Sequence, residues 1–441
     1  MFPAFLPAQH KGRKGRASSL ALAIALAGAG ILGAAGVAEP AYAAKEKQKE
    51  GKADYSPTFV KAYQPMSEAN SKATDAAGAE ALRGMIPGLV EAIKTDDDKL
   101  AGGQLILNIG GKLKDPTVQR QGLMLQLESG KVPDEQVATF NYYVGSLSWD
   151  MKDYANARTY LKQAIDAGHT GDNIERLYAE TFFAQNQNAE GLAALHELVA
   201  KNGKAIPEDT FRRALQVAYE AKMTNEIANW AADLVRYHPS PETWNTSLAV
   251  VGDSYGFAAQ ETLDLMRLMK RTNALLTGRE YVDYIEAADP RRMSNEVLPL
   301  IDEAVSKGLI QPSDVFLQDA KTTAQGRSAA DRSDAPQLAK DARTAKDGVP
   351  ARAAGDNFMS LGDAASAEEM YKLALQKGNV ETDRVTTRLG IVQADQGKFD
   401  EARATFQQIT GVREPIAKMW LAYIDSKAGG TTAAAPAPAA Q

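Results

Sequence analysis

Cysteine is absent from this chain of 441 residues. Its absence excludes disulfides, thiolate metal ligands and cysteine nucleophiles, so any chemistry must use oxygen and nitrogen groups. Neither sign of charge is in large excess, because 50 basic residues stand against 56 acidic ones and the net charge is −6. A broad phosphate-neutralising surface is therefore not expected, and nucleic acid is not a predicted partner. With 44% hydrophobic and 24% charged residues, the composition is typical of a globular protein.

The first 43 residues have the pattern of a secretory signal. A basic stretch precedes an uncharged segment from Ala17 to Ala38 that is rich in Ala and Leu, and Ala41-Tyr42-Ala43 supplies the small-x-small pattern that signal peptidase reads. Cleavage is expected after Ala43. The alternative is an uncleaved anchor, since about 21 apolar residues could just span a bilayer. The sequence thus predicts an exported protein, with the periplasm of a Gram-negative bacterium as its destination and no other membrane span.

Two internal repeats follow. Four small or apolar positions recur 34 residues later: Gly145, Ala157, Leu161 and Ala164 correspond to Ala179, Gly191, Leu195 and Leu198. Four positions nearer the carboxyl end recur 35 residues later: Gly355, Ala367, Tyr371 and Ala374 correspond to Gly390, Ala402, Phe406 and Ile409. Their spacing within each unit places them on one face of a helix pair.

This pattern resembles the tetratricopeptide repeat, a helix–turn–helix unit of 34 residues. The resemblance implies an all-α fold, an α-solenoid of tetratricopeptide-like repeats, in which small residues let paired helices approach and large apolar ones fill the space between neighbours. Less regular helix pairs are predicted over 57–95, 99–127, 209–237, 241–276 and 280–307. A helix from Glu414 to Leu421 is expected to cap the last repeat.

The chain divides into six predicted segments. After the signal peptide of residues 1–43, a charged disordered leader covers 44–54 and a helical repeat superhelix covers 55–310. Residues 311–348, rich in Ala, Asp, Lys and Arg, are predicted to form either a thin helical pair or a hinge. Residues 349–427 hold the C-terminal tetratricopeptide-like repeats with their capping helix, and the Ala/Pro-rich residues 428–441 form a disordered tail.

One motif suggests catalysis. The segment from Gly252 to Gly256 fits the glycine-x-serine-x-glycine elbow of serine hydrolases, with Ser254 as the nucleophile. That fold places its histidine after the serine, whereas His10, His169, His196 and His238 all precede Ser254. The flanking pattern is helical, so we interpret the motif as a turn between helices. The histidines lie on different repeats, and neither a metal site nor a cofactor is predicted.

The resemblance also indicates where a partner binds. In tetratricopeptide-like repeats, the first helix of each pair lines a concave groove. Carried over to this sequence, the groove positions are Tyr142, Trp149, Asp150, Arg176, Glu180, Phe183, Arg352, Asp356, Met359, Arg384 and Asp395. Aromatic and arginine side chains are good anchors for a partner. The alternative is that Trp149, Phe183 and Met359 pack between helices and that Arg176 is merely solvated.

Chaperone-tail-binding members of the family use a lysine and an asparagine at two groove places. Tyr142 and Ser146 occupy these places here, so that specificity is not predicted. The expected function is that of a non-enzymatic exported scaffold that binds a protein or peptide partner in its groove, in cell-envelope assembly or export. The alternative is an envelope hydrolase or polysaccharide-handling factor with an unrecognised site, for which Ser254 is the candidate nucleophile.

Overall fold

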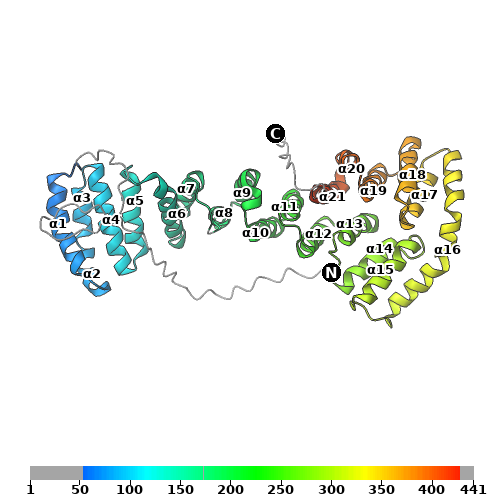
Figure 1. The fold of residues 1–441 in the computed structure, drawn as a ribbon, viewed down its shortest axis with the longest axis horizontal. Coiled ribbons are helices and arrows are strands. Elements are labelled where there is room, and N and C mark those ends of the chain that lie inside the picture. The colour runs from blue at the N-terminus through cyan, green and yellow to red at the C-terminus, as the bar shows by residue number, and fades with distance from the viewer. Residues whose placement is uncertain (1–52, 172, 428–441) are drawn as a thin grey trace, which may run out of the picture.

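The computed structural model describes residues 53–171 and 173–427, and these residues form twenty-one α-helices, two short 3-10 helices and no strand (Figure 1). The predicted all-α solenoid is therefore confirmed. The predicted signal peptide, most of the charged leader and the Ala/Pro tail lie outside the described residues. At the end of the leader, the N–H of Asp54 donates to the Asp97 carboxylate at 2.8 Å, so this residue is fixed on the first repeats. No helix in the described ranges is long and apolar enough to cross a membrane.

The chain begins with an N-terminal body of five helices: α1 (Pro57–Lys72), α2 (Ala76–Arg83), α3 (Ile86–Ala92), α4 (Asp96–Leu113) and α5 (Pro116–Glu128). The pair predicted over 57–95 is three helices, because the chain turns at Gly84. Helices α4 and α5 cross very closely. A Cβ atom on Gly103 would lie 2.7 Å from the carbonyl oxygen of Gly122, so only glycine fits at this crossing.

Five further pairs continue the solenoid: α6 (Asp134–Asp150) and α7 (Tyr154–Asp166), α8 (Ile174–Phe183) and α9 (Asn188–Asn202), α10 (Glu208–Glu220) and α11 (Thr224–Tyr237), α12 (Pro241–Tyr255) and α13 (Ala259–Arg271), α14 (Gly278–Ala288) and α15 (Ser294–Ser306). The short helix η1 (Gly203–Ala205) follows α9. We call α6 to α10 the arm.

The repeat positions meet as the sequence pattern predicts. A Cβ atom on Gly145 would lie 2.7 Å from Leu161 Cγ, and one on Gly390 would lie 2.8 Å from the Phe406 ring. The small residue therefore faces the large apolar one across each helix pair. Leu161 and Phe406 are at most 1% exposed, so each repeat buries its apolar face within the stack.

Residues 315–344 differ from the prediction. They form one continuous helix, α16 (Val315–Thr344), and neither a helical pair nor a hinge. Small residues recur along its inner face and are buried, among them Ala320, Ala324, Ala335, Ala339 and Ala342. Because the alanine side chain is small, the helix axis can approach its neighbours closely without large apolar residues between them. Pro336 lies on the exposed side, where water can satisfy the carbonyl that lacks its usual N–H donor.

The last helices are α17 (Val349–Ser360), α18 (Ala364–Lys377), α19 (Thr382–Asp395), α20 (Phe399–Phe406), η2 (Gly411–Arg413) and α21 (Glu414–Lys427). Trp420 on α21 is fully buried and stacks on Phe406 at 5.7 Å between ring centroids, so α21 covers the last repeat as predicted. Its other side packs on α11, where Arg236 pairs with Asp425 at 3.1 Å. The capping helix therefore connects the last repeat to α11, which lies much earlier in the chain.

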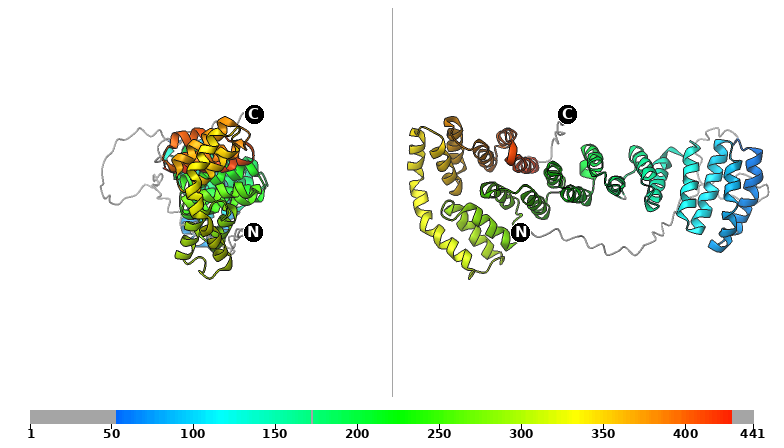
Figure 2. Two further views of the ribbon diagram at one scale, coloured as in Figure 1. Left: turned by 90° about the vertical axis from the view of Figure 1, so that its right-hand side faces the viewer. Right: turned by 180° about the vertical axis from the view of Figure 1, so that it is seen from behind.

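The solenoid thus turns back on itself after α16. Figure 1 shows α19 to α21 lying beside α11 to α13, and the view from behind in Figure 2 shows the same arrangement. We call α11 to α21 the ring. One apolar core extends from Ala157 to Ile424, so residues 157–310 share a core with the predicted segment 349–427 across α16. The buried apolar residues before Ala157 form two smaller clusters.

Candidate functional site

The first helices of the arm carry a ladder of polar side chains. Arg176 on α8 donates to Asp209 on α10 at 2.8 Å, and Arg213 on α10 donates to Glu180 on α8 at 2.6 and 3.1 Å. Each pair joins positions 33 residues apart, one residue less than the 34-residue period, and so links neighbouring repeats. Arg176 and Asp209 are 40% and 47% exposed, so water screens the pair and it contributes little to stability. These charges can exchange their internal partners for those of a ligand at low cost.

The ladder continues beyond the predicted residues. Tyr219 on α10 donates to Asp253 on α12 at 2.6 Å, and Arg212 donates to Thr246 at 3.2 Å. Sequence reasoning missed these positions, and it also missed Asp209 and Arg213. The last two lie 33 residues after Arg176 and Glu180, one residue short of the 34-residue period, so a strict period leads to Thr210 and Ala214 instead.

The aromatic residues of the arm divide into two environments. Trp149 is half-buried and lies 5.3 Å from the Tyr154 ring, with exposed Asp150 beside it in sequence. Tyr142 is also half-buried and stacks on His169 at 4.4 Å. Phe183, by contrast, is only 8% exposed and fills the space left by Gly191, so its ring packs between helices. Tyr142 and Trp149 are therefore partly accessible, whereas Phe183 belongs to the core.

We call the groove positions predicted on α17 and α19 the C-terminal groove. Four of these five residues gather around Asp356, and the fifth, Asp395, pairs with Arg271 on α13. Helix α13 packs against α19 at these positions. Arg352 pairs with Asp356 at 3.1 Å, and Arg384 lies 3.5 Å from the same carboxylate. Tyr371 donates to Asp356 at 2.8 Å and also contacts the Met359 sulfur at 3.4 Å. Asp356 and Met359 are at most 9% exposed, so neither presents an open surface.

Arg388 lies at the centre of this groove, although the sequence pattern did not identify it. Its guanidinium donates to Asp356 at 2.6 Å, to Asp264 on α13 at 3.2 Å and to Gln260 on α13 at 2.7 Å. The side chain is 0% exposed. A fully buried arginine is tolerated here because its guanidinium donates hydrogen bonds to two carboxylates and to one amide oxygen.

Asp264 is the anionic centre on the α13 side. It accepts hydrogen bonds from Arg388, from Arg267 at 2.8 Å and from Arg413 at 2.7 Å. Burial alone raises the pKa of Asp264, but the charges of the three guanidinium groups outweigh burial and hold this pKa at about 2. The Trp420 indole N–H donates to the Asp264 carbonyl at 3.3 Å, which ties α21 to the same point.

A second ion pair joins the far ends of α13 and α19. Arg271 donates two hydrogen bonds to Asp395, at 2.6 and 2.5 Å. This pair and the Asp264–Arg388 pair both join residues 124 positions apart. The helices therefore run parallel, with an acid opposite an arginine at one level and an arginine opposite an acid at the next.

A cavity of about 440 Å³ is lined by residues of α13, α14, α15, α17 and α19 and by the first residue of α18. Glu296 in its wall accepts from Arg267 at 2.8 and 2.7 Å and from the Tyr284 hydroxyl at 2.7 Å. Lys270 pairs with Glu303, and Arg271 pairs with Asp395. The charged residues of the wall therefore already have ionic partners within the chain.

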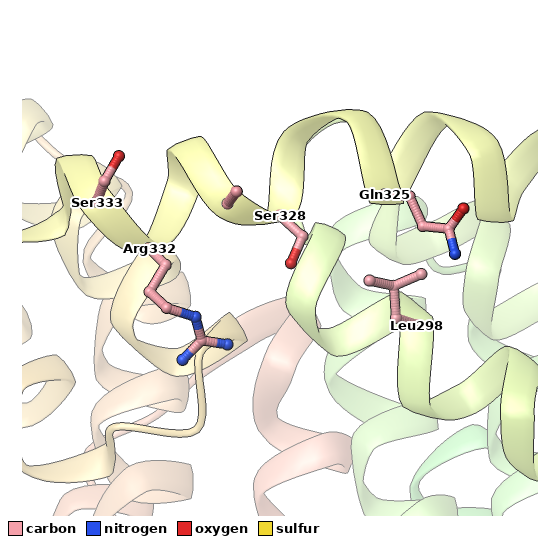
Figure 3. A pocket seen from close by; sticks show the side chains of 6 residues that line it. Leu298, Gln325, Ser328, Arg332 and Ser333 are labelled. Atoms are coloured by element: carbon pink, nitrogen blue, oxygen red, sulfur yellow. The ribbon is translucent and has the colours of Figure 1, made fainter.

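A shallower hollow of about 500 Å³ lies between α15 and α16. Figure 3 shows Leu298 on one side and Gln325, Ser328, Arg332 and Ser333 along α16. The Ser328 hydroxyl donates to Asn295 at 2.8 Å, and Arg332 donates to the same amide oxygen at 3.1 Å. Its polar groups thus serve to hold α16 on α15.

The hydrolase motif takes a conformation that differs from both interpretations of the sequence. Gly252 to Tyr255 are the last turn of α12, and Gly256 ends the helix with φ of 58°. The Ser254 hydroxyl donates to the Val250 carbonyl at 2.7 Å, one helical turn earlier. The motif is neither an interhelical turn nor an elbow after a strand, because α12 continues through it. The described residues contain no group of three side chains that could hold a metal ion.

The comparison with protein families agrees with this architecture at one repeat. The tetratricopeptide repeat family model matches residues 138–167, which belong to α6 and α7. A comparison with the curated proteins found no match.

Two similar solved structures are the hetero-tetramer Cut9–Hcn1 of APC/C and Naa15/Naa10 bound to HypK-THB. The first is 9% identical, covers 85% of this chain and 71% of its own, and has a TM-score of 0.25. The second is 11% identical, covers 84% of this chain and 67% of its own, and has a TM-score of 0.23. With TM-scores this low, neither structure bears on the function of this chain. Its own helix pairs show an all-α solenoid, and the matched repeat model covers one of these pairs, at residues 138–167.

Proposed function

We propose that this protein is an exported, non-enzymatic scaffold that binds a protein or peptide partner along the first helices of its arm, in cell-envelope assembly or export. The observation that carries the proposal is the half-exposed ladder on α8 and α10. Its arginine and carboxylate groups are paired only with one another, at 19–47% exposure. Helices α8 and α10 pack on their neighbours in the stack, and the ladder lies across them.

The chemistry of the ladder favours a polypeptide ligand. Charges of both signs alternate at repeat spacing, and Trp149 provides an aromatic anchor at one end. An extended or helical segment that crosses several repeats could replace one partner of a ladder ion pair at each repeat with its own charged side chain. Arginine is well suited to this exchange because its planar donors match carboxylates and peptide carbonyls.

The proposal is tested by site-specific photo-crosslinking in cells of the source organism. A crosslinker at Asp209 should capture a defined partner, and a matched crosslinker at exposed Lys201 on α9 should not. Changing Trp149 to Ala and Arg176 to Glu together should reduce the Asp209 crosslink by more than ten-fold while the helical circular dichroism spectrum is retained. Equal crosslinking at both sites, or an unchanged yield in the variant, would contradict binding along the arm.

The exported location is a separate part of the proposal, supported by the signal pattern of the first 43 residues. Mass spectrometry of the mature protein should find Ala44 as its first residue in a periplasmic fraction. An intact Met1 in the cytoplasmic fraction would refute export, and an intact N-terminus in the membrane fraction would favour the uncleaved anchor.

A further inference from the structure

Arg384, in the first turn of α19, is a largely buried arginine that is poorly satisfied. Its side chain is 11% exposed, and its Nε atom is buried without a hydrogen-bond partner among the described residues. The nearest carboxylates, of Asp356 and Glu381, lie at 3.5 and 3.6 Å, whereas a charge-assisted hydrogen bond measures about 2.7–2.9 Å. An unsatisfied charged donor is costly to bury, so this position calls for an acceptor that the chain itself does not supply.

The charges around Arg384 leave it incompletely neutralised. Asp356 accepts hydrogen bonds from Arg388 at 2.6 Å and from Arg352 at 3.1 Å, so one carboxylate faces three arginines. Glu381 is 70% exposed, and water screens its charge. Without Glu381, the connected network in the described ranges holds five arginines and four carboxylates: Arg267, Arg352, Arg384, Arg388 and Arg413 against Glu261, Asp264, Glu296 and Asp356. The network therefore carries one positive charge in excess.

The protonation equilibrium of Arg384 agrees with this charge balance. Burial and then the charge of Arg388 lower the pKa of Arg384 below its ordinary value, and Asp356 offsets them only in part. Arg352 lies against the same carboxylate and is 23% exposed, so solvent reaches the pair from its side. Since no short hydrogen bond fixes the Arg384 guanidinium, it can turn toward a ligand beside Arg352 without losing one.

The geometry and the charge of the site favour a carboxylate as this ligand. The planar donors of a guanidinium match the two oxygens of a carboxylate, and two adjacent arginines can hold it from both sides. One carboxylate supplies the single negative charge that the network lacks. A phosphate dianion would overcompensate this charge and would bring a third oxygen that needs a further donor.

We propose that Arg352 and Arg384 form a carboxylate-binding site for an acidic side chain or a terminal carboxylate of a polypeptide. Helices α13, α17 and α19 keep their packing when the ligand binds, because only the Arg384 side chain needs to turn. The site is separate from the ladder of the arm, so it can fail its test while binding along the arm remains.

The full chain, labelled with 15N-arginine, is titrated with blocked tripeptides and followed by NMR of the arginine Nε–H groups. Acetyl-Ala-Glu-Ala-amide presents a side-chain carboxylate, and acetyl-Ala-Ala-Ala with a free C-terminus presents a terminal one. At least one of the two should shift the Arg384 signal saturably, and the tighter one identifies the source. Acetyl-Ala-Gln-Ala-amide, the neutral control, should leave the signal in place. The Arg384 signal is identified by its loss in Arg384→Gln.

Two variants and a control test the residues. Arg384→Gln and Arg352→Gln should each weaken carboxylate binding at least about ten-fold, the effect of losing a hydrogen bond between charged groups. Thermal unfolding separates this role from a structural one. Without ligand, Arg384→Gln should be at least as stable as wild type, because it removes a poorly satisfied buried charge. Arg343→Gln, at a side chain 53% exposed on α16, should bind the carboxylate as wild type does.

The proposal is overturned if neither carboxylate peptide moves the Arg384 signal, or if the glutamine peptide moves it equally. Tighter binding of inorganic phosphate than of either peptide would overturn the assignment to carboxylates. Unweakened binding by both variants would place the site elsewhere. A ligand-free Arg384→Gln that melts below both wild type and Arg343→Gln would show that Arg384 is a structural partner of Asp356 rather than a ligand-binding residue.

Discussion

Arg388→Met is expected to lower the free energy of unfolding by about 3 kcal/mol, the lower end of the range for breaking a buried ion pair by removing one partner. The side chain is 0% exposed and contacts Asp264, Asp356 and Gln260. Methionine retains much of the aliphatic volume but donates no hydrogen bond. Asp264 keeps two arginine partners and Asp356 keeps Arg352, so neither carboxylate is left without a cation.

The change is measured by urea denaturation with circular dichroism, together with hydrogen exchange of peptides from α13 and α19. Hydrogen exchange is needed because a chain of this length can open the ring before it unfolds globally. Arg327→Met is the control. Arg327 is 54% exposed and pairs only with Asp331 one turn away, so its loss should cost less than about 0.5 kcal/mol.

A loss below about 1 kcal/mol for Arg388→Met would refute the conclusion that this network holds the ring closed. A double-mutant cycle with Asp264→Asn gives a second check. Asparagine removes the charge that Arg388→Met leaves with fewer partners, so the combined loss should be smaller than the sum by at least about 1 kcal/mol. Strict additivity would show that the two residues do not interact in solution.

Three further predictions concern other features of the fold. The Asp264 contribution should be complete above about pH 3.8, the ordinary pKa of aspartate, and should be lost as the pH falls toward 2, because its pKa is lowered in the folded state; pH titration of the stability difference between wild type and Asp264→Asn checks this. Gly390→Ala should destabilise by about 1–3 kcal/mol in thermal unfolding, because the added Cβ would lie 2.8 Å from a phenylalanine ring, whereas Gly326→Ala, with open space around it, should stabilise α16 by about 0.5–1 kcal/mol. Ser254→Ala should leave turnover in an esterase panel unchanged, since the hydroxyl is bonded to its own helix; a loss of turnover would revive the hydrolase alternative.

The helix pairs were predictable because their signals are local. Gly145 and Leu161 face each other within one repeat, and the pattern of small and large residues shows this directly. The prediction for residues 311–348 was wrong for a related reason. Their alanines carry little hydrophobic signal, and only the neighbouring helices show that Ala324 and Ala339 are buried on one side of a single helix.

The candidate site was predictable only in part. The repeat positions led to Asp356 and Asp395, but a position in a repeat does not tell which side chains of the chain itself pack against it. The charge of a residue was also a misleading guide to its exposure. Arg388 is an ordinary arginine in sequence, yet it is fully buried, because its partners come from a helix 124 residues earlier.

The sequence by itself determined the architecture of the stack: an all-α chain whose period of 34–35 residues sets how each helix packs on the next. Tertiary structure alone decided that the stack closes into a ring and that α13 packs against α19 at the C-terminal groove. The physical reason is that the curvature of a solenoid is the sum of small rotations between neighbouring repeats, so its two ends meet only through the accumulated geometry of many units. The ion pairs of Asp264 and Arg271 with α19 form only after that closure.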